Sequence, residues 1–185
     1  MGTDRLPPLP ESSLSPAQKR AAAELATGPR GAVFGPFVPL LRSPDFLSPL
    51  QKAGEYLRYK SALAPRLSEF AILLVARRWN QQYEWHVHRP IAERAGVPVE
   101  HVQAVAEGRR PDGMAPDQAV VHDFLQELQA NRSVSDVTYR RAVELFGERG
   151  VIDLCGICGY YSTLAMVMNV ARTPLPEGVE PPLAT

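Results

Sequence analysis

SEFAILLVARRWNQQYEWHVHRPIAERAG, residues 68–96 of the chain, contains two helix-patterned runs joined by a short polar segment. Apolar side chains occupy both faces of the first run, so this helix is expected to be buried nearly all round. The two runs place Glu69, Glu84 and His88 in an apolar setting. Glu84 and His88 are four positions apart, so on a helix their side chains share one face and can meet. Two carboxylates and an imidazole together indicate proton-transfer chemistry.

The position of Glu69 has two interpretations. Its row on the helix is otherwise apolar, and an unpaired charge would be costly there, so a buried Glu69 needs a partner. Alternatively, Glu69 lies in water in the first turn, where the helix dipole stabilises a carboxylate. Periodicity alone does not separate the two. Pro90 leaves a similar choice in the second run, because proline removes one backbone hydrogen bond: residues 84–88 form either a bent first turn or a separate short helix.

The rest of the chain also predicts helices, and no stretch alternates apolar and polar residues clearly enough for a strand. The predicted fold class is therefore all-α. Ser15-Pro16 predicts the start of a helix, Gly28 predicts its end, and Ser48-Pro49 repeats the start signal. The loop between these helices is rich in glycine and proline but carries apolar side chains, so it is expected to pack on the core. Later helices are expected at 99–108, 116–131, 135–147 and 151–171.

Composition favours a small-molecule partner. The 185 residues suit one domain, and Lys plus Arg and Asp plus Glu both total 20, so no overall field draws the chain to nucleic acid or to an anionic membrane. The N-terminal MGTDRLPPLPESSLSPAQK lacks the apolar core of a secretory signal, so a cytoplasmic location is expected. Polar residues and glycines interrupt residues 151–171, which favours a buried or interface helix over a membrane span.

Cys155 and Cys158 form the only C-x-x-C pair, a spacing that can indicate a redox dithiol. They lie inside LCGICGYYSTLAMVMNV, beside small and aromatic residues, and packing at a helix contact is favoured instead. No specific spacing supports a metal site, so neither a metal nor another cofactor is expected. Such a site would have to join Glu84 and His88 to a distant group, for which the candidates are Glu69, His101 and His122.

The order of motifs resembles a known family. An apolar helix carrying a glutamate, then YEWxxH, then IAERAGVPVEHVQAV, is similar to the carboxymuconolactone decarboxylase family, which includes the alkyl hydroperoxidase D proteins. The resemblance is most specific over about 67–107, and YYSTLAMVMNV near the C-terminus fits it more weakly. It implies a multi-helix bundle that assembles into homo-oligomers, trimers or hexamers. The domain organisation that follows is an N-terminal extension at 1–64, the family domain at 65–173 and a tail at 174–185.

The resemblance also separates two branches of the family. Gln81 and Glu84 stand where the hydroperoxidase branch keeps a C-x-x-C, while His88 and Glu69 match the histidine and glutamate of its proton relay. A carboxamide and a carboxylate cannot form the sulfenate or disulfide of a thiol cycle. The decarboxylase branch, which lacks the cysteines, therefore fits better. It implies a cofactor-free lyase or isomerase that acts on a lactone or a related carboxylic acid.

This function assigns catalysis to Glu69, Glu84 and His88. His88 is the candidate donor to the lactone carbonyl oxygen, and Glu84 or Glu69 delivers the proton to carbon. Which carboxylate is the acid stays open, because burial raises a carboxyl pKa whereas a nearby imidazolium lowers it.

Substrate binding requires a cation for an anionic substrate and an apolar wall. The candidate substrate-binding residues are Trp85, His86, Arg77 and Phe37, of which Phe37 has the alternative role of completing the core. Two other functions stay open. One is a thiol peroxidase that uses Cys155 and Cys158, and the other is a non-catalytic oligomer that binds a ligand.

Overall fold

The computed structural model describes residues 3–184, and all regular structure in that range is helical. The predicted all-α class is confirmed. A 3₁₀ turn, η1 (Glu11–Ser13), precedes eight α-helices: α1 (Pro16–Thr27), α2 (Phe37–Leu40), α3 (Pro44–Tyr59), α4 (Pro65–Arg78), α5 (Gln82–Arg94), α6 (Val99–Ala106), α7 (Pro116–Asn131) and α8 (Asp136–Ala171).

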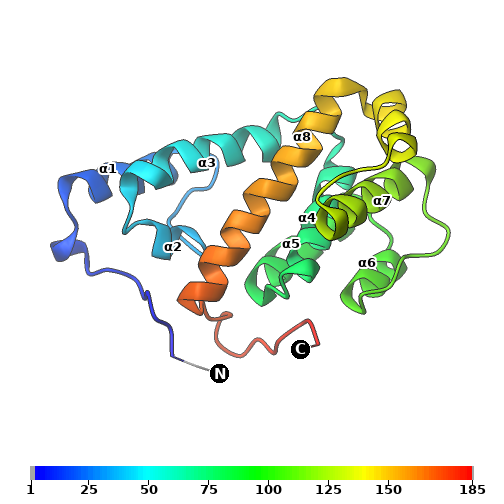
Figure 1. The fold of residues 1–185 in the computed structure, drawn as a ribbon. Helices are drawn as coiled ribbons and strands as arrows, with labels where there is room; N and C mark the ends of the chain where they lie inside the picture. Colours follow the sequence, from blue (N-terminus) through cyan, green and yellow to red (C-terminus); the bar gives the residue numbers. More distant parts are fainter. Residues whose placement is uncertain (1–2, 185) are drawn as a thin grey trace.

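The long helix α8 lies between two groups of helices (Figure 1). It packs on α2 and α3 from the N-terminal third of the chain, and on α4 and α7 from the middle. Gly147 has non-helical backbone angles (φ 67°, ψ 172°), so α8 is two helices joined at a kink, as the separate predictions for 135–147 and 151–171 require. Within the described residues, α8 alone is long and apolar enough to cross a membrane, a weak criterion that buried core helices also meet.

Helix α4 is the centre of the core. Ten consecutive residues, 67–76, are buried, which confirms the prediction of a helix covered on all sides. Such a helix needs neighbours in every direction, and α4 packs on α5, α6, α7 and α8. A polar side chain within residues 67–76, such as Glu69, therefore enters the protein interior.

The N-terminal helices follow their start signals with one correction. Ser15 caps α1, as predicted, and the structure adds a capping box with Gln18. The predicted start at Ser48-Pro49 is wrong, because α3 begins five residues earlier at Ser43-Pro44 and contains Pro49. The earlier Ser-Pro pair offers the same first-turn signal, and the helix tolerates Pro49 at the loss of one backbone hydrogen bond.

The loop between α1 and α3 packs as predicted. Phe37, Leu40 and Leu41 are buried, whereas Phe46 is 47% exposed. The two ends of the described chain also attach to the bundle: the Arg5 backbone N–H donates to the Ala171 carbonyl at 2.8 Å. At the other end, the Leu183 backbone exchanges two hydrogen bonds with a side-chain amide of α5.

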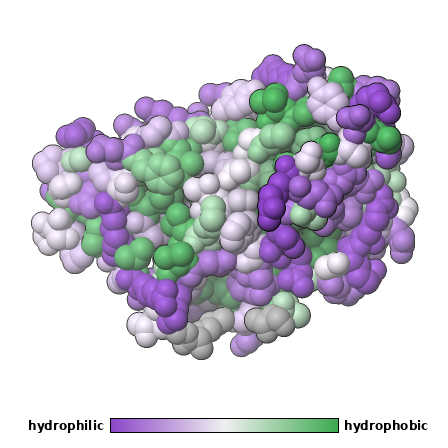
Figure 2. Space-filling view, in the orientation of Figure 1, coloured by the Kyte–Doolittle hydropathy of each residue, from purple (hydrophilic) through white to green (hydrophobic). Residues whose placement is uncertain are grey.

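The surface is uneven in polarity. Figure 2 shows hydrophobic and neutral residues along the diagonal of α8, while hydrophilic residues dominate over the helices on its right. The exposed apolar side chains on α8 include Ile152 and Val170.

Candidate functional site

Glu69 and His88 form a buried pair across α4 and α5. The Glu69 Oε2 and His88 Nδ1 atoms lie 2.7 Å apart, and each side chain is 7% exposed. Glu69 is in the second turn of α4, so the interpretation of a solvated first-turn carboxylate is wrong. With Nδ1 engaged by the carboxylate, Nε2 is the ring nitrogen left for another group.

Glu84 is buried without a partner for one of its oxygens. The residue is 3% exposed, and no hydrogen bond reaches its Oε2. Burial raises the pKa of this carboxyl well above its usual value of 4.5. Glu84 is therefore a neutral carboxylic acid at a pH where an ordinary glutamate is ionised, and its proton can be donated.

Gln81 fixes the start of the helix that carries Glu84 and His88. Its side-chain oxygen accepts from the Glu84 backbone N–H at 3.0 Å, and its amide donates to Asn169 Oδ1 on α8 at 3.1 Å. Helix α5 then runs without a break through Pro90, so the alternative of a separate short helix is wrong. Glu84 and His88 stay one turn apart on one helical face.

A cavity of about 30 Å³ joins Glu84 to His88. Its walls come from the loop before α2 and from α2, α3, α5 and α8, and they are mainly apolar, including Phe34, Phe37, Leu164 and Met168. This volume suits water-sized molecules. Glu69 does not line the cavity; it lies behind His88.

Two arginines that the sequence reasoning missed also line this cavity. Arg30 donates from Nη2 to the Tyr160 hydroxyl at 3.0 Å, and its guanidinium lies 4.5 Å from the centre of the Phe37 ring. Its Nε is buried without a hydrogen-bond partner. Arg58 reaches the same cavity from α3. Both arginines come from the N-terminal third, far along the chain from Glu84, and no spacing signal connects them to it.

Two tyrosines of α8 lie close to the polar residues of the cavity, and one of them, Tyr161, lines it. Tyr161 stands edge-on to the His88 ring, with 5.2 Å between ring centres, and lines the cavity. Burial raises its pKa well above 10, so it remains a phenol that can donate a hydrogen bond. Burial likewise raises the pKa of Tyr160 to about 12. Gly54 on α3 leaves the space that the Tyr160 hydroxyl occupies, and a glycine inside a helical pattern was the sequence signal for such a close approach.

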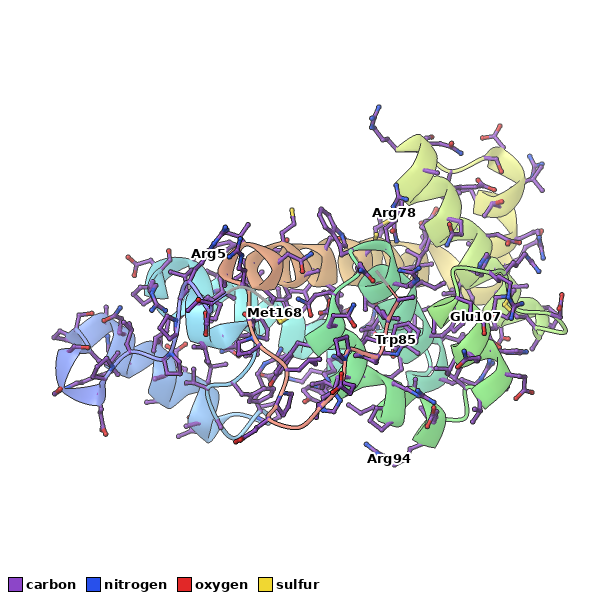
Figure 3. All side chains as sticks on the ribbon, turned by 90° about the horizontal axis from the view of Figure 1, so that it is seen from below. Arg5, Arg78, Trp85, Arg94, Glu107 and Met168 are labelled. Atoms are coloured by element: carbon purple, nitrogen blue, oxygen red, sulfur yellow. The ribbon has the colours of Figure 1, made fainter. Side chains whose placement is uncertain are left out.

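The structure brings some predicted substrate-binding residues to the cavity and places others elsewhere. Phe37 lines the cavity and is also part of the core, so it completes the core as one alternative predicts, and its role in substrate binding stays a prediction. Trp85 is fully buried inside the bundle but does not line it (Figure 3). His86 is half-buried on the same helix and also lies outside the cavity lining. Arg77 lines a different hollow and bonds to Asn80.

The two cysteines lie on α8 but outside the cavity lining. Both are free thiols, with Cys155 at the surface and Cys158 buried. Desolvation raises the pKa of both thiols, which lowers the thiolate fraction that redox chemistry needs. Among residues 3–184, no group of three His, Cys, Asp or Glu side chains is arranged to hold a metal ion.

No protein-family model and no curated protein matches the sequence. The fold matches that of a solved structure, an uncharacterized peroxidase-related protein from Ralstonia eutropha JMP134 with an alkylhydroperoxidase AhpD core. The TM-score is 0.76 at 17% sequence identity, over 96% of this chain and 95% of that chain. The protein thus has an AhpD-like helical fold. Because 96% of the chain is covered, the shared fold includes helices before α4 as well as the core.

Proposed function

We propose that the protein is a cofactor-free lyase or isomerase that transfers a proton on a lactone or a related carboxylic acid. One observation carries the proposal: a carboxylic acid kept neutral by burial, Glu84, and an imidazole oriented by a buried carboxylate, His88, line one cavity. Two ionisable groups in contrasting environments are the usual arrangement for acid and base roles at neutral pH. The lactone class comes from the sequence resemblance.

Substrate binding is assigned to the two arginines. Arg30 and Arg58 line the same cavity as Glu84 and His88, so a carboxylate that they hold would lie close to the proposed acid, and guanidinium groups match carboxylates in shape. Since the cavity is only about 30 Å³, substrate entry requires the neighbouring loop to move outwards. That loop, 28–36, contains Gly31 and Gly35, both with positive φ.

In the proposed decarboxylation, the bond between the ring carbon and the substrate carboxylate breaks, and carbon dioxide leaves. The electron pair moves towards the lactone carbonyl oxygen, where protonated His88 and the Tyr161 phenol are the donors that stabilise it. Glu69 orients His88 and balances its charge, in the role that a buried carboxylate plays beside a catalytic histidine. Glu84 then gives its proton to the carbon and regains one from water.

A panel of carboxylated unsaturated lactones in D₂O, followed by proton NMR, tests the proposal. Turnover should release carbon dioxide and leave one deuterium at the carbon that Glu84 protonates. Glu84→Gln should abolish turnover, because the amide has a similar shape but no transferable proton. Glu93→Gln is the matched control on the surface of the same helix, where Glu93 pairs with Arg89, and it should retain full activity. Turnover that persists in Glu84→Gln would refute the assignment.

A thiol peroxidase is the second candidate, since the fold match is to a protein described as peroxidase-related. This chemistry would depend on Cys155 and Cys158, whose thiols have raised pKa values and do not line the cavity. Peroxide consumption by the wild type that disappears on changing both cysteines to serine would establish it. Equal consumption before and after the change would exclude the pair.

Assembly and location stay predictions. We propose a homo-oligomer located in the cytoplasm, acting on a small molecule and binding neither nucleic acid nor membrane. The exposed Ile152 and Val170 on α8 are consistent with a contact between subunits.

A further inference from the structure

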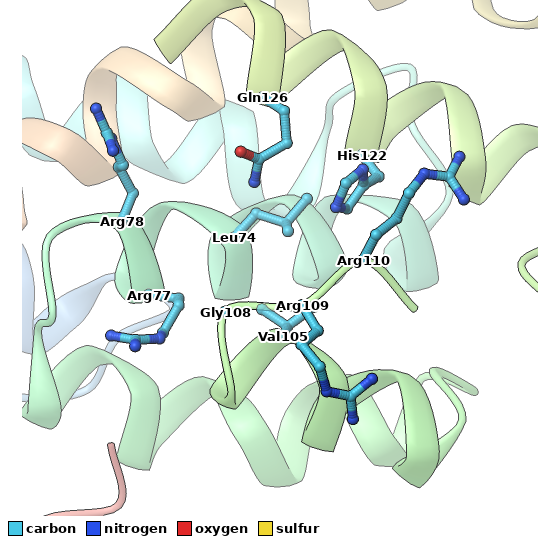
Figure 4. Close-up of a pocket in the computed structure, with 9 residues that line it drawn as sticks. All are labelled: Leu74, Arg77, Arg78, Val105, Gly108, Arg109, Arg110, His122 and Gln126. Atoms are coloured by element: carbon cyan, nitrogen blue, oxygen red, sulfur yellow. The ribbon is translucent and has the colours of Figure 1, made fainter. Parts of the chain in front are cut away.

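A second, wider hollow lies apart from the Glu84–His88 cavity. It has a volume of about 480 Å³, lies between α4, α6 and α7, and shares no lining residue with that cavity. The volume is in the range of small-molecule sites. Figure 4 shows its polar side chains: Arg77 and Arg78 stand on one side of Leu74, with His122 and Arg110 on the other.

The hollow carries an excess of positive charge. Four of its lining residues are arginines, of which Arg109 pairs with Glu107 and Arg110 with Asp123. No carboxylate of the described residues forms a salt bridge with Arg77 or Arg78. Because Asp123 is also shared with Arg141, the two carboxylates leave at least two of the four guanidinium charges uncompensated. A concave surface with a charge excess concentrates counter-ions of opposite sign.

The Arg77 guanidinium lacks an anionic partner among the described residues. It is half-buried, its Nη1 donates only to the neutral Asn80 side chain at 3.1 Å, and its Nε is buried without a hydrogen-bond partner. A partly desolvated guanidinium with an unfilled donor is unfavourable unless an acceptor supplies the bond and the charge. Gly108 (φ 74°) makes the turn after α6 beside the Arg77 guanidinium and brings Arg109 and Arg110 to the same hollow.

We propose that this hollow is a binding site for a small organic dianion, separate from the proton-transfer site. Two negative charges balance the two uncompensated guanidinium groups, and both Arg77 and Arg78 line the hollow, where guanidinium N–H groups can donate to carboxylate or phosphate oxygens. Leu74 and Val105 form an apolar part of the wall, which favours an organic molecule over an inorganic ion. Dicarboxylates and phosphate monoesters share the required chemistry.

Calorimetric titration of the full chain at low, constant ionic strength tests this site. The probes are succinate, glutarate and glycerol phosphate, with inorganic sulfate, butyrate and neutral succinamide for comparison. At least one organic dianion should bind saturably and about tenfold more tightly than sulfate or butyrate, because both charges and the carbon chain are recognised. Stronger binding by the dicarboxylates or by glycerol phosphate identifies the source of the dianion.

Variants assign the binding to this hollow. The double change Arg77→Gln with Arg78→Gln should weaken the best dianion about tenfold or more at an unchanged melting temperature. If the double variant is unstable, Arg78→Gln alone serves, because Arg78 is exposed and has no salt-bridge partner among the described residues. The control is Arg94→Gln, an exposed arginine on α5 at the opposite edge of the molecule from Arg78 (Figure 3). Binding that follows only ionic strength, or that Arg94→Gln weakens equally, would overturn the proposal.

Discussion

Removal of the Glu69 carboxylate tests the buried pair without a known substrate. Both side chains are 7% exposed and their polar atoms lie 2.7 Å apart, so solvent screens the contact little. Breaking a buried pair costs about 3–5 kcal/mol, and we expect the lower end for Glu69→Ala because an imidazole, unlike an ammonium or a guanidinium, also exists as a neutral group near neutral pH. For a chain of this size, about 3 kcal/mol lowers the melting temperature by about 6–12 °C. In Glu69→Gln a neutral hydrogen bond of about 0.5–1.5 kcal/mol replaces a charged one of about 1.5–3 kcal/mol, so the loss is smaller.

Thermal unfolding followed by circular dichroism at pH 7 measures the expected order of melting temperatures, with the wild type above Glu69→Gln and Glu69→Gln above Glu69→Ala. In parallel, ¹⁵N NMR reports the protonation of His88 at each ring nitrogen. Glu93→Ala is the control: Glu93 pairs with Arg89 at the surface, where the two side chains are 30% and 44% exposed. Exposed pairs contribute about 0–1 kcal/mol, so its melting temperature should change little. A Glu69→Ala protein that melts with the control, with unchanged His88 nitrogen signals, would contradict the pairing and the role built on it.

Three further predictions concern stability and assembly. Because burial raises the pKa of Glu84, the wild type has extra stability below pH 4.5 and loses it as the pH rises through the raised pKa. In chemical denaturation, the free energy of unfolding of Glu84→Gln relative to the wild type should therefore increase with pH. A difference between the two proteins that does not change with pH would count against a neutral Glu84. Gly54→Ala places a methyl group against the Tyr160 side chain and should lower the free energy of unfolding by about 1–3 kcal/mol. Gly159→Ala on α8 is the control: an added methyl group has no neighbour within 4 Å there, so this change should be neutral or stabilising. Equal melting temperatures of the two variants would contradict the close contact between Gly54 and Tyr160. Light scattering should give a mass above the 20.4 kDa of one chain, and Ile152→Glu, at a side chain 68% exposed, should lower it; a wild-type monomer would refute the oligomer.

Local periodicity was sufficient for the fold class and for the burial of α4, but it left open whether Glu69 is buried and did not identify His88 as its partner. A ten-residue apolar run leaves α4 no solvent face, and a carboxylate within it requires a partner. The start of α3 was misplaced because Ser43-Pro44 and Ser48-Pro49 carry the same signal, and only tertiary packing selects between them.

The cations of the cavity were not predictable in the same way. Arg77 was chosen because it lies near Glu84 in the sequence, yet it lines the other hollow, and Arg30 and Arg58 take the place beside Glu84. The positions of Arg30 and Arg58 depend on how α3 and the loop before α2 pack on α8, and this packing joins segments that are far apart in the sequence. Hydrophobic periodicity encodes which face of a helix is buried, but it does not encode which distant helix covers that face.

The two carboxylates of the site share an apolar setting, and their proposed roles differ because their hydrogen-bond partners differ. Glu69 has a ring nitrogen at 2.7 Å, so its charge can be held as part of a pair, and it lies outside the cavity. Glu84 has an oxygen without a hydrogen-bond partner, burial raises its pKa well above the usual value so that the neutral acid is favoured, and it lines the cavity. If the two environments were exchanged, the glutamate that lines the cavity would no longer be a neutral proton donor. The sequence left open whether Glu69 or Glu84 is the acid. The hydrogen-bond partners of the two carboxylates favour Glu84 for this role.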